Sequence, residues 1–206
     1  MNKLSNRAEQ AAQTDFFLIA GLGNPGRAYR LNRHNVGFML IDKLADVVGI
    51  KMGKVQSKAI TGMGKLDGKQ VLLVKPQTFM NLSGKSIAAL LNYYRIPIDH
   101  LMVIHDDLDI PLGAIRIRAG GGAGGQKGMA SIIQHLKTQT FPRMRIGIGR
   151  PPGRMQAADY VLEDFLPDEH VILEEVLEKA CFAIRVFLTS GIAQAMTQYN
   201  QQSQKD

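Results

Sequence analysis

Residues 21–37, GLGNPGRAYRLNRHNVG, decide how this chain is organised. The apolar run FFLIA in front of them predicts a buried strand. The glycines that end this run allow backbone conformations closed to other residues. Behind the stretch, apolar positions at helical spacing over residues 36–48 predict a packed helix. The stretch is therefore a loop between a strand and a helix, where binding and catalytic residues are common, and it carries Asn24 and His34.

Residues 21–26 also match the dinucleotide-binding pattern G-x-G-x-x-G, and they follow a predicted strand. In that motif a helix begins at the glycines and directs its N-terminal amides at a pyrophosphate. Here Pro25 and a polar run intervene, and the acidic residues at a suitable distance, Asp42 and Asp46, fall inside the predicted helix. The sequence therefore disfavours a nucleotide site. Because a lone histidine is more often structural than catalytic, this stretch by itself leaves the role of His34 open.

Length and composition indicate a single globular domain: 206 residues, 45% of them hydrophobic and 21% charged. No apolar run is long enough to cross a bilayer, and the N-terminal residues lack the apolar core of a secretory signal. The one cysteine, Cys181, cannot form an intramolecular disulfide, which suits a reducing cytosol. The histidines and the cysteine show no metal-ligand spacing. We therefore expect a cytoplasmic protein with no membrane partner, no metal and no cofactor.

Charge is segregated along the sequence. The net charge is +7, and residues 110–158 contain eight cations and no acidic residue. These cations are Arg116, Arg118, Lys127, Lys137, Arg143, Arg145, Arg150 and Arg154. Residues 159–178 reverse the pattern, with eight acidic residues and no lysine or arginine. Two such segments can simply face each other. An acid-free stretch of this length nevertheless favours contact with a polyanion, because cations placed against phosphates release condensed counterions.

Apolar runs separated by turn signals predict alternating strands and helices. The predicted strands are residues 16–20, 56–66, 70–74, 101–104, 115–118 and 143–148. The predicted helices are residues 36–48, a segment between Ser83 and Pro97, 129–137, 167–188 and 191–199. This alternation is typical of an α/β protein. We expect one domain over residues 16–200, with a twisted mixed β-sheet flanked by α-helices, between a disordered tail at 1–15 and a frayed end at 201–206.

Some of these elements have further expected features. The Asp-Gly pair between the second and third strands should close a hairpin, and the Ser83 hydroxyl should cap the helix that follows it. The strands 115–118 and 143–148 alternate in period two, so each should have one apolar and one cationic face. Between them, GGGAGGQKG at 120–128 resembles a phosphate-cradling loop, but Gln126 stands where that pattern requires lysine. The backbone amides of this loop can still face an anion.

Polar side chains recur where the predicted strands end. Asn24 and His34 follow the first strand, Asn81 follows the third, and Asp106 ends the fourth. In an α/β sheet such junctions meet at the carboxyl edge, where ligands bind. An aspartate that accepts from one imidazole nitrogen leaves the other free as a base, and amides can hold a water or stabilise an oxyanion. Without an evident nucleophile, the set favours hydrolysis by activated water. The structural alternative is that Asn81 caps a helix and Asp106 neutralises a surface histidine.

Five motifs together resemble one family. They are G-L-G-N-P-G-x-x-Y-x-x-x-R-H-N-x-G, F-M-N-L-S-G-K, H-D-D-L-D-x-P-x-G, the glycine-rich loop and R-x-R-I-G-I-G-R-P. Residues 17–188, which carry these motifs, are similar to bacterial-type peptidyl-tRNA hydrolase. The resemblance implies hydrolysis, without a metal, of the ester that joins a peptide to the 3′-terminal ribose of tRNA. The implied partner is peptidyl-tRNA, bound by a monomer through its acceptor end and 5′-phosphate.

The resemblance also assigns roles to individual residues. His34 matches the base of the family, and Asp106 matches the carboxylate that orients it. Asn24 and Asn81 match the amides that place the peptide and the attacking water. The substrate and tRNA contacts that the resemblance implies are Tyr29, Met80, Asn81, Lys127, Arg118 and Arg145. Among these, the tyrosine would meet the terminal nucleotides and the two arginines would hold the tRNA 5′-phosphate.

The glycine-rich loop departs from the family pattern. It usually reads G-H-N-G, with the asparagine in the active site, whereas residues 125–128 read G-Q-K-G. If Lys127 faces the active site, its charge should disfavour a protonated His34 and stabilise an oxyanion. If it points outward, it should meet a tRNA phosphate or only solvent.

Two other functions stay open at the level of sequence. The first is that the chain is a catalytically idle relative that binds RNA. Because RNA binding needs neither His34 nor Asp106, the presence of both residues favours the enzyme. A nucleotide-dependent enzyme is the second, and it would have to bind ATP or NAD. We therefore expect an ester hydrolase that acts on peptidyl-tRNA.

Overall fold

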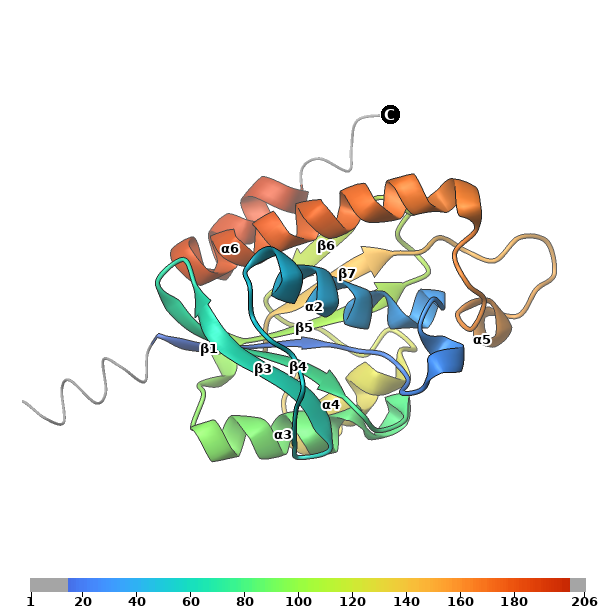
Figure 1. Cartoon of the computed structure of the whole chain (residues 1–206). Coiled ribbons are helices and arrows are strands. Elements are labelled where there is room, and N and C mark those ends of the chain that lie inside the picture. The colour runs from blue at the N-terminus through green and yellow to red at the C-terminus, as the bar shows by residue number, and fades with distance from the viewer. Residues whose placement is uncertain (1–14, 201–206) are drawn as a thin grey trace, which may run out of the picture.

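A mixed sheet of seven strands crosses the molecule in this computed structural model, which describes residues 15–200 (Figure 1). The strands are β1 (Phe16–Gly21), β2 (Lys54–Gln56), β3 (Ala59–Leu66), β4 (Lys69–Pro76), β5 (Leu101–Asp107), β6 (Ile115–Arg118) and β7 (Arg143–Gly147). They follow the order β2-β3-β4-β1-β5-β7-β6, in which β4, β1, β5 and β7 are parallel and the other pairings are antiparallel. The predicted mixed sheet is confirmed. Apart from Asp15, the tails predicted at 1–15 and 201–206 lie outside the described residues.

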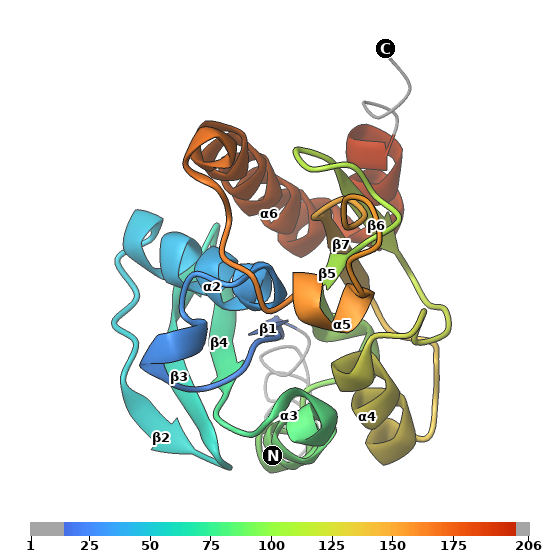
Figure 2. The same cartoon turned by 90° about the vertical axis from the view of Figure 1, so that its right-hand side faces the viewer.

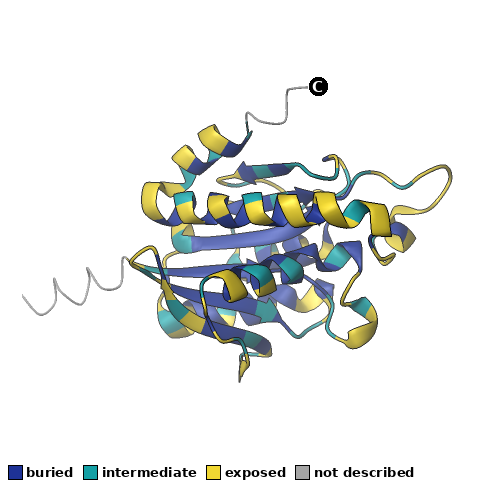
Figure 3. Ribbon diagram, turned by 45° about the horizontal axis from the view of Figure 1, so that its top comes forward, coloured by how far each residue is buried: buried dark blue, intermediate teal, exposed yellow. Residues whose placement is uncertain are grey.

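Helices cover both faces of the sheet. α2 (Val36–Val47) and α6 (His170–Asn200) lie on one face, and α3 (Ser83–Tyr94) and α4 (Lys127–Leu136) lie on the other (Figure 1). The central strands are apolar throughout because each of their faces meets a helix layer. In β1, for example, Ile19 packs in the cluster under α2 and α6, whereas Leu18 packs in the cluster over α3 and α4. Figure 3 shows the result, with buried strands between helices whose outer sides are exposed.

The loop after β1 owes its glycines to close packing. A Cβ atom on Gly21 would lie 2.0 Å from the carbonyl oxygen of Gly37, so neither strand nor helix could carry a side chain at this crossing. The chain then passes through the short 3₁₀ turns η1 (Arg27–Tyr29) and η2 (Arg33–Asn35) before α2 begins. Because no helix begins at these glycines, the loop lacks the helix N-terminus that a dinucleotide site of the G-x-G-x-x-G type requires.

Two expected features of the elements are wrong in detail. The strand predicted at 56–66 is two strands, because Ser57 and Lys58 both adopt positive φ and turn the chain between β2 and β3. The Ser83 hydroxyl does not cap α3. The 3₁₀ turn η3 (Met80–Leu82) precedes the helix, and the hydroxyl donates instead to the Met80 carbonyl at 2.9 Å.

The C-terminal elements follow the prediction more closely. The helix predicted at 167–188 corresponds to the 3₁₀ turn η5 (Pro167–Glu169) and the first part of α6, and the helix predicted at 191–199 corresponds to the rest of α6. The two parts of α6 meet at Gly191, where φ is 81°. One short helix, α5 (Ala157–Tyr160), precedes η5. Within residues 15–200, none of the helices combines the length and the apolarity that a bilayer crossing requires.

The two-faced character predicted for β6 and β7 is confirmed. The apolar positions of both strands, Ile115, Ile117, Met144 and Ile146, are buried in the cluster beneath α6. The antiparallel register pairs Arg116 with Arg145 and Arg118 with Arg143. Because side chains alternate along a strand, the four arginines share the opposite face of this edge of the sheet.

Candidate active site

The carboxyl ends of β1, β4 and β5 bring the predicted polar residues to one place. Figure 2 looks onto this edge of the sheet, with α5 in front of it. A cavity of about 840 Å³ opens here. Its lining includes six of the residues expected from sequence, namely Asn24, His34, Met80, Asn81, Asp106 and Lys127. The structure therefore brings together every residue proposed for catalysis, although they lie on three separate segments of the chain.

His34 and Asp106 form a hydrogen-bonded pair. Nδ1 of His34, on η2, donates to Oδ2 of Asp106, at the end of β5, over 2.8 Å. The carboxylate side chain is 4% exposed and the imidazole 12%, so the pair is not the surface contact that the structural alternative supposed. With Nδ1 engaged, Nε2 is the nitrogen left to accept a proton.

A second pair of residues positions Asn24. The Asn35 side chain accepts from the backbone N–H of Asn24 at 2.8 Å and donates to its carbonyl at 3.0 Å. The Oδ1 atom of Asn24 in turn accepts from the backbone N–H of Met80 at 3.0 Å. The oxygen of this amide is thus occupied, while its Nδ2 makes no hydrogen bond to any described residue. The sequence analysis did not assign Asn35 to the site. Its position directly after His34, in the motif R-H-N, was the signal that could have identified it.

The glycine-rich loop contributes a residue that sequence reasoning did not assign to the site. Gln126 is 9% exposed, and its Oε1 accepts from the backbone N–H of Met129, so it caps the N-terminus of α4. Its Nε2 donates to Oδ1 of Asp106 at 3.2 Å. The loop approaches closely at Gly128, where a Cβ atom would lie 2.6 Å from Sδ of Met80. Glycine here allows Gln126 to reach the carboxylate.

Asn81 and Lys127 lie at the mouth of the cavity. Both are exposed, Asn81 on η3 and Lys127 at the first position of α4. α3 has no side-chain cap, so the alternative of Asn81 as a helix cap is wrong. An amide and an ammonium therefore face the space in front of the buried pair, where they can contact a polar or anionic substrate group.

The loop that carries His34 is fastened to the segment before α6. The backbone N–H of His34 donates to the Val161 carbonyl at 2.8 Å, and that of Arg33 donates to the Glu163 carbonyl at 2.9 Å. The Arg33 guanidinium is buried, contacts Glu169 at 2.7 Å, and stacks on two aromatic rings. Residues 160–169 consequently fix the position of the loop that carries His34.

Three of the residues expected to contact tRNA, Tyr29, Arg118 and Arg145, are not among the residues that line the cavity. Tyr29 is half-buried on η1. On the arginine face, Arg118 is exposed and Arg145 pairs through Nε with Asp107. Arg143 is 2% exposed and donates to the carbonyls of Gly121, Gly122 and Gln139. Burial lowers the pKa of Arg143 to about 10, so it stays charged at neutral pH and serves to hold the glycine-rich loop.

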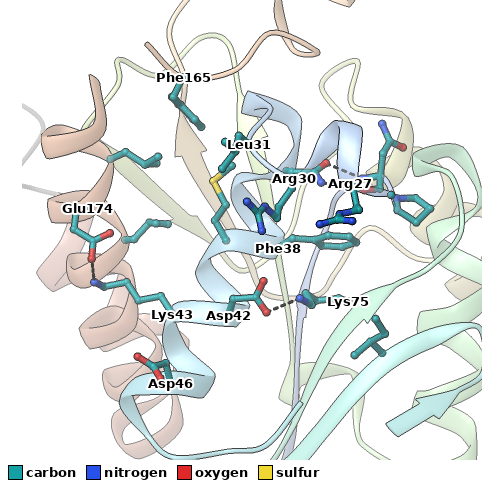
Figure 4. Close-up of a pocket in the computed structure, with 18 of the residues that line it drawn as sticks. Arg27, Arg30, Leu31, Phe38, Asp42, Lys43, Asp46, Lys75, Phe165 and Glu174 are labelled. Carbon is teal, nitrogen blue, oxygen red and sulfur yellow. Dashed lines mark hydrogen bonds and ion pairs between the residues drawn. The ribbon is translucent and has the colours of Figure 1, made fainter. Parts of the chain in front are cut away.

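A second cavity, of about 770 Å³, lies on the other side of the loop after β1 (Figure 4). It follows α2 toward α6 and shares Asn24 with the first cavity. Within it, Lys43 pairs with Glu174 and Lys75 with Asp42, and Figure 4 shows Arg27 and Arg30 next to Phe38. These pairs neutralise much of its charge. Among residues 15–200, no three histidine, cysteine or acidic side chains are grouped as metal ligands.

Comparisons with known proteins agree with this site. The model of the peptidyl-tRNA hydrolase family matches residues 18–206. The peptidyl-tRNA hydrolase of Chloroflexus aggregans is 48% identical over 185 residues, covering 89% of this chain and 98% of that protein. That of Carboxydothermus hydrogenoformans is 50% identical over 184 residues, with the same coverage. The crystal structure of the Acinetobacter baumannii peptidyl-tRNA hydrolase superimposes with a TM-score of 0.85 at 35% identity, covering 91% of this chain and 95% of that one. The chain therefore belongs to the peptidyl-tRNA hydrolase family.

Proposed function

We propose that this protein hydrolyses the ester bond between a peptide and the 3′-terminal ribose of tRNA. The observation that carries the proposal is the buried His34–Asp106 pair at the floor of a cavity that amide side chains also line. Membership of the family supports peptidyl-tRNA as the substrate. We propose that a monomer acts, in the cytoplasm, where peptidyl-tRNA is made.

The geometry supports a single displacement by water. Because Asp106 accepts from Nδ1 of His34, the imidazole keeps the tautomer whose Nε2 is unprotonated. Nε2 takes a proton from a water as that water attacks the ester carbonyl carbon. The proton then passes to the ribose oxygen as the carbon–oxygen bond breaks. The products are a peptide with a free carboxyl group and a tRNA with a free ribose hydroxyl.

Amides are placed to stabilise the negative charge that develops on the carbonyl oxygen. Because Oδ1 of Asn24 is occupied by Met80, the Nδ2 group is the part of this amide available as a donor. Asn81 is exposed and lines the same cavity, where its amide suits the water or the peptide. Lys127 lines the same cavity, and its ammonium suits the oxyanion or a phosphate near the end of the tRNA.

The tRNA itself would extend from the cavity toward the arginine face. We place its 5′-phosphate at Arg118 and Arg145, and its terminal nucleotides near Tyr29, Met80 and Asn81. The exposure of Arg118 supports this placement, because an arginine free of protein carboxylates can pair with a phosphate. Arg143 is excluded as a contact because its guanidinium is committed to the glycine-rich loop.

The test is incubation of the purified protein with N-acetyl-aminoacyl-tRNA in the presence of chelator, following release of the acyl group. We expect rapid release, with free aminoacyl-tRNA left largely intact as the control substrate. A His34→Ala variant, assayed in parallel, measures the hydrolysis that does not depend on His34. Binding of the substrate without release would instead identify an idle RNA-binding relative and contradict the proposal.

A further inference from the structure

Two of its three hydrogen-bond partners, the Met129 N–H and the Asp106 carboxylate, determine the orientation of the Gln126 amide, and the third, Sδ of Met80, also accepts from Nε2. Oε1 accepts from the backbone N–H of Met129 at 2.9 Å, and a backbone N–H can only donate. The NH₂ group must therefore be the part that faces Asp106, where Nε2 lies 3.2 Å from Oδ1. A flipped amide would lose the cap on α4 and set oxygen against a carboxylate. Gln126 is thus a fixed donor aimed at the carboxylate that holds His34.

Two side chains donate hydrogen bonds to the Asp106 carboxylate. It is buried, its Oδ2 accepts from His34, and its Oδ1 accepts from Gln126. A hydrogen bond to a carboxylate favours the ionised form, and a buried carboxylate without one is costly. With both oxygens held, the plane of the carboxylate is fixed and Oδ2 stays directed at Nδ1 of the imidazole.

We propose that Gln126 is a positioning residue for the catalytic pair, an inference that rests on the proposed function. It acts through Asp106, because its amide holds the carboxylate that orients His34. The family usually has a titratable histidine at this place in the loop, whereas an amide keeps the same charge at every pH.

Other charged groups face this pair from the neighbouring elements. They are His105, Asp107 and Asp109 on and after β5, Lys127 on α4, and Arg145 and Arg150 on and after β7. All of them are unchanged in variants of residue 126. A comparison of such variants with the wild type therefore isolates the contribution of the amide.

Three substitutions of Gln126 separate its role as a hydrogen-bond donor to Asp106 from its role as the N-terminal cap of α4. Q126E keeps an acceptor for the Met129 N–H, so α4 stays capped, but an ionised carboxylate cannot donate to Asp106. Q126M can neither donate nor cap. Q126H restores a donor and is the conservative variant. Q134E, on the exposed side of α4, makes the same change of charge without contact to the site.

The readouts are kcat and KM for N-acetyl-aminoacyl-tRNA at pH 8 and the thermal midpoint. We expect Q126E and Q126M to lose kcat by about tenfold or more with little change in KM, a cost typical of removing the partner that orients a functional group. Q134E should keep the wild-type thermal midpoint, whereas Q126E should lower it, because it sets a second buried carboxylate against Asp106. Q126H should retain most activity, because a ring N–H can again donate to the Asp106 carboxylate.

Wild-type kcat in Q126E, with loss of kcat only in Q126M, would show that Gln126 is a helix cap alone and overturn the inference. A loss of kcat in Q126H as large as that in Q126M would also contradict it. Absence of hydrolysis by the wild-type protein would overturn the proposed function as well, so the two failures are distinguishable.

Discussion

Nδ1 of His34 lies 2.8 Å from Oδ2 of Asp106, and both side chains are largely withdrawn from solvent. The contact joins the loop after β1 to the end of β5, two strands that are neighbours in the parallel part of the sheet. An imidazole held in this way has one orientation and one free nitrogen. The predictions below start from that pair and move outward.

Asp106→Asn should lower kcat by about two to four orders of magnitude, because the amide no longer holds the imidazole in the required tautomer. His34→Ala should cost a similar factor. Since the two residues act as one unit, the double variant should be little slower than either single variant. Initial rates with N-acetyl-aminoacyl-tRNA measure this, and multiplicative losses would show that the residues act independently.

Asn35→Ala should reduce both stability and activity, because it leaves the backbone N–H and carbonyl of Asn24 without their partners. We expect a loss of about 1–3 kcal/mol in the free energy of unfolding, the cost of unsatisfied polar groups at a buried site. Urea unfolding measures it, and Asn92→Ala on the exposed side of α3 is the control. Unchanged stability and kcat would mean that Asn24 holds its position without this clamp.

Arg118→Ala should raise KM for tRNA substrates and reduce the slope of log KM against log salt by about one phosphate contact. A small ester that lacks the tRNA body should be cleaved at the wild-type rate. Lys65→Ala, an exposed cation on β3 at the other side of the sheet, controls for net charge. If the small ester suffers as much as tRNA, the arginine acts on folding or chemistry and not on binding.

Lys127→Met and Lys127→Asn should both lower kcat for N-acetyl-aminoacyl-tRNA. Lys127 lines the cavity that also holds His34 and Asp106, and its positive charge can stabilise the oxyanion that forms when water attacks the ester. Initial rates over a range of substrate concentrations measure this. An unchanged kcat with a raised KM for tRNA would assign the lysine to a phosphate contact.

Acidification from pH 7 to 5 should lower the free energy of unfolding through His105. Burial lowers the pKa of this histidine, although the neighbouring Asp106 carboxylate opposes the shift. The unfolded chain then binds the proton more readily, so stability falls as pH drops below the unfolded value of about 6.5, by up to about 1.4 kcal/mol per pH unit. Urea unfolding should show a shallower pH slope for His105→Gln, and an equal slope would show that the pKa of His105 is the same in the native and unfolded states.

Much of the architecture was predictable because it follows from local patterns. Four-residue apolar runs identify strands buried on both faces, and the rule that parallel strands end at one edge was enough to gather Asn24, His34 and Asp106. The turn between β2 and β3 was not predictable in this way. Ser57 and Lys58 adopt positive φ without a glycine to mark them, so the run looked continuous.

The supporting residues of the site were harder to infer because they act across loops. Gln126 and Asn35 are polar residues in loops, and only the meeting of the glycine-rich loop with β5, or of η2 with the loop after β1, gives them partners. Period-two alternation likewise placed four arginines on one face without distinguishing them. The buried Arg143 differs from the exposed Arg118 because the glycine-rich loop folds over one and leaves the other open.

The bonds from the His34 loop to Val161, Glu163 and Glu169 also bear on how the protein is made. Synthesis proceeds from the N-terminus, so His34 and Asp106 emerge long before the segment that fixes the His34 loop. The loop can therefore reach its final position only after residues 160–169 have been added and folded. The proposed base is thus positioned late in the making of the chain, although it lies near its N-terminus.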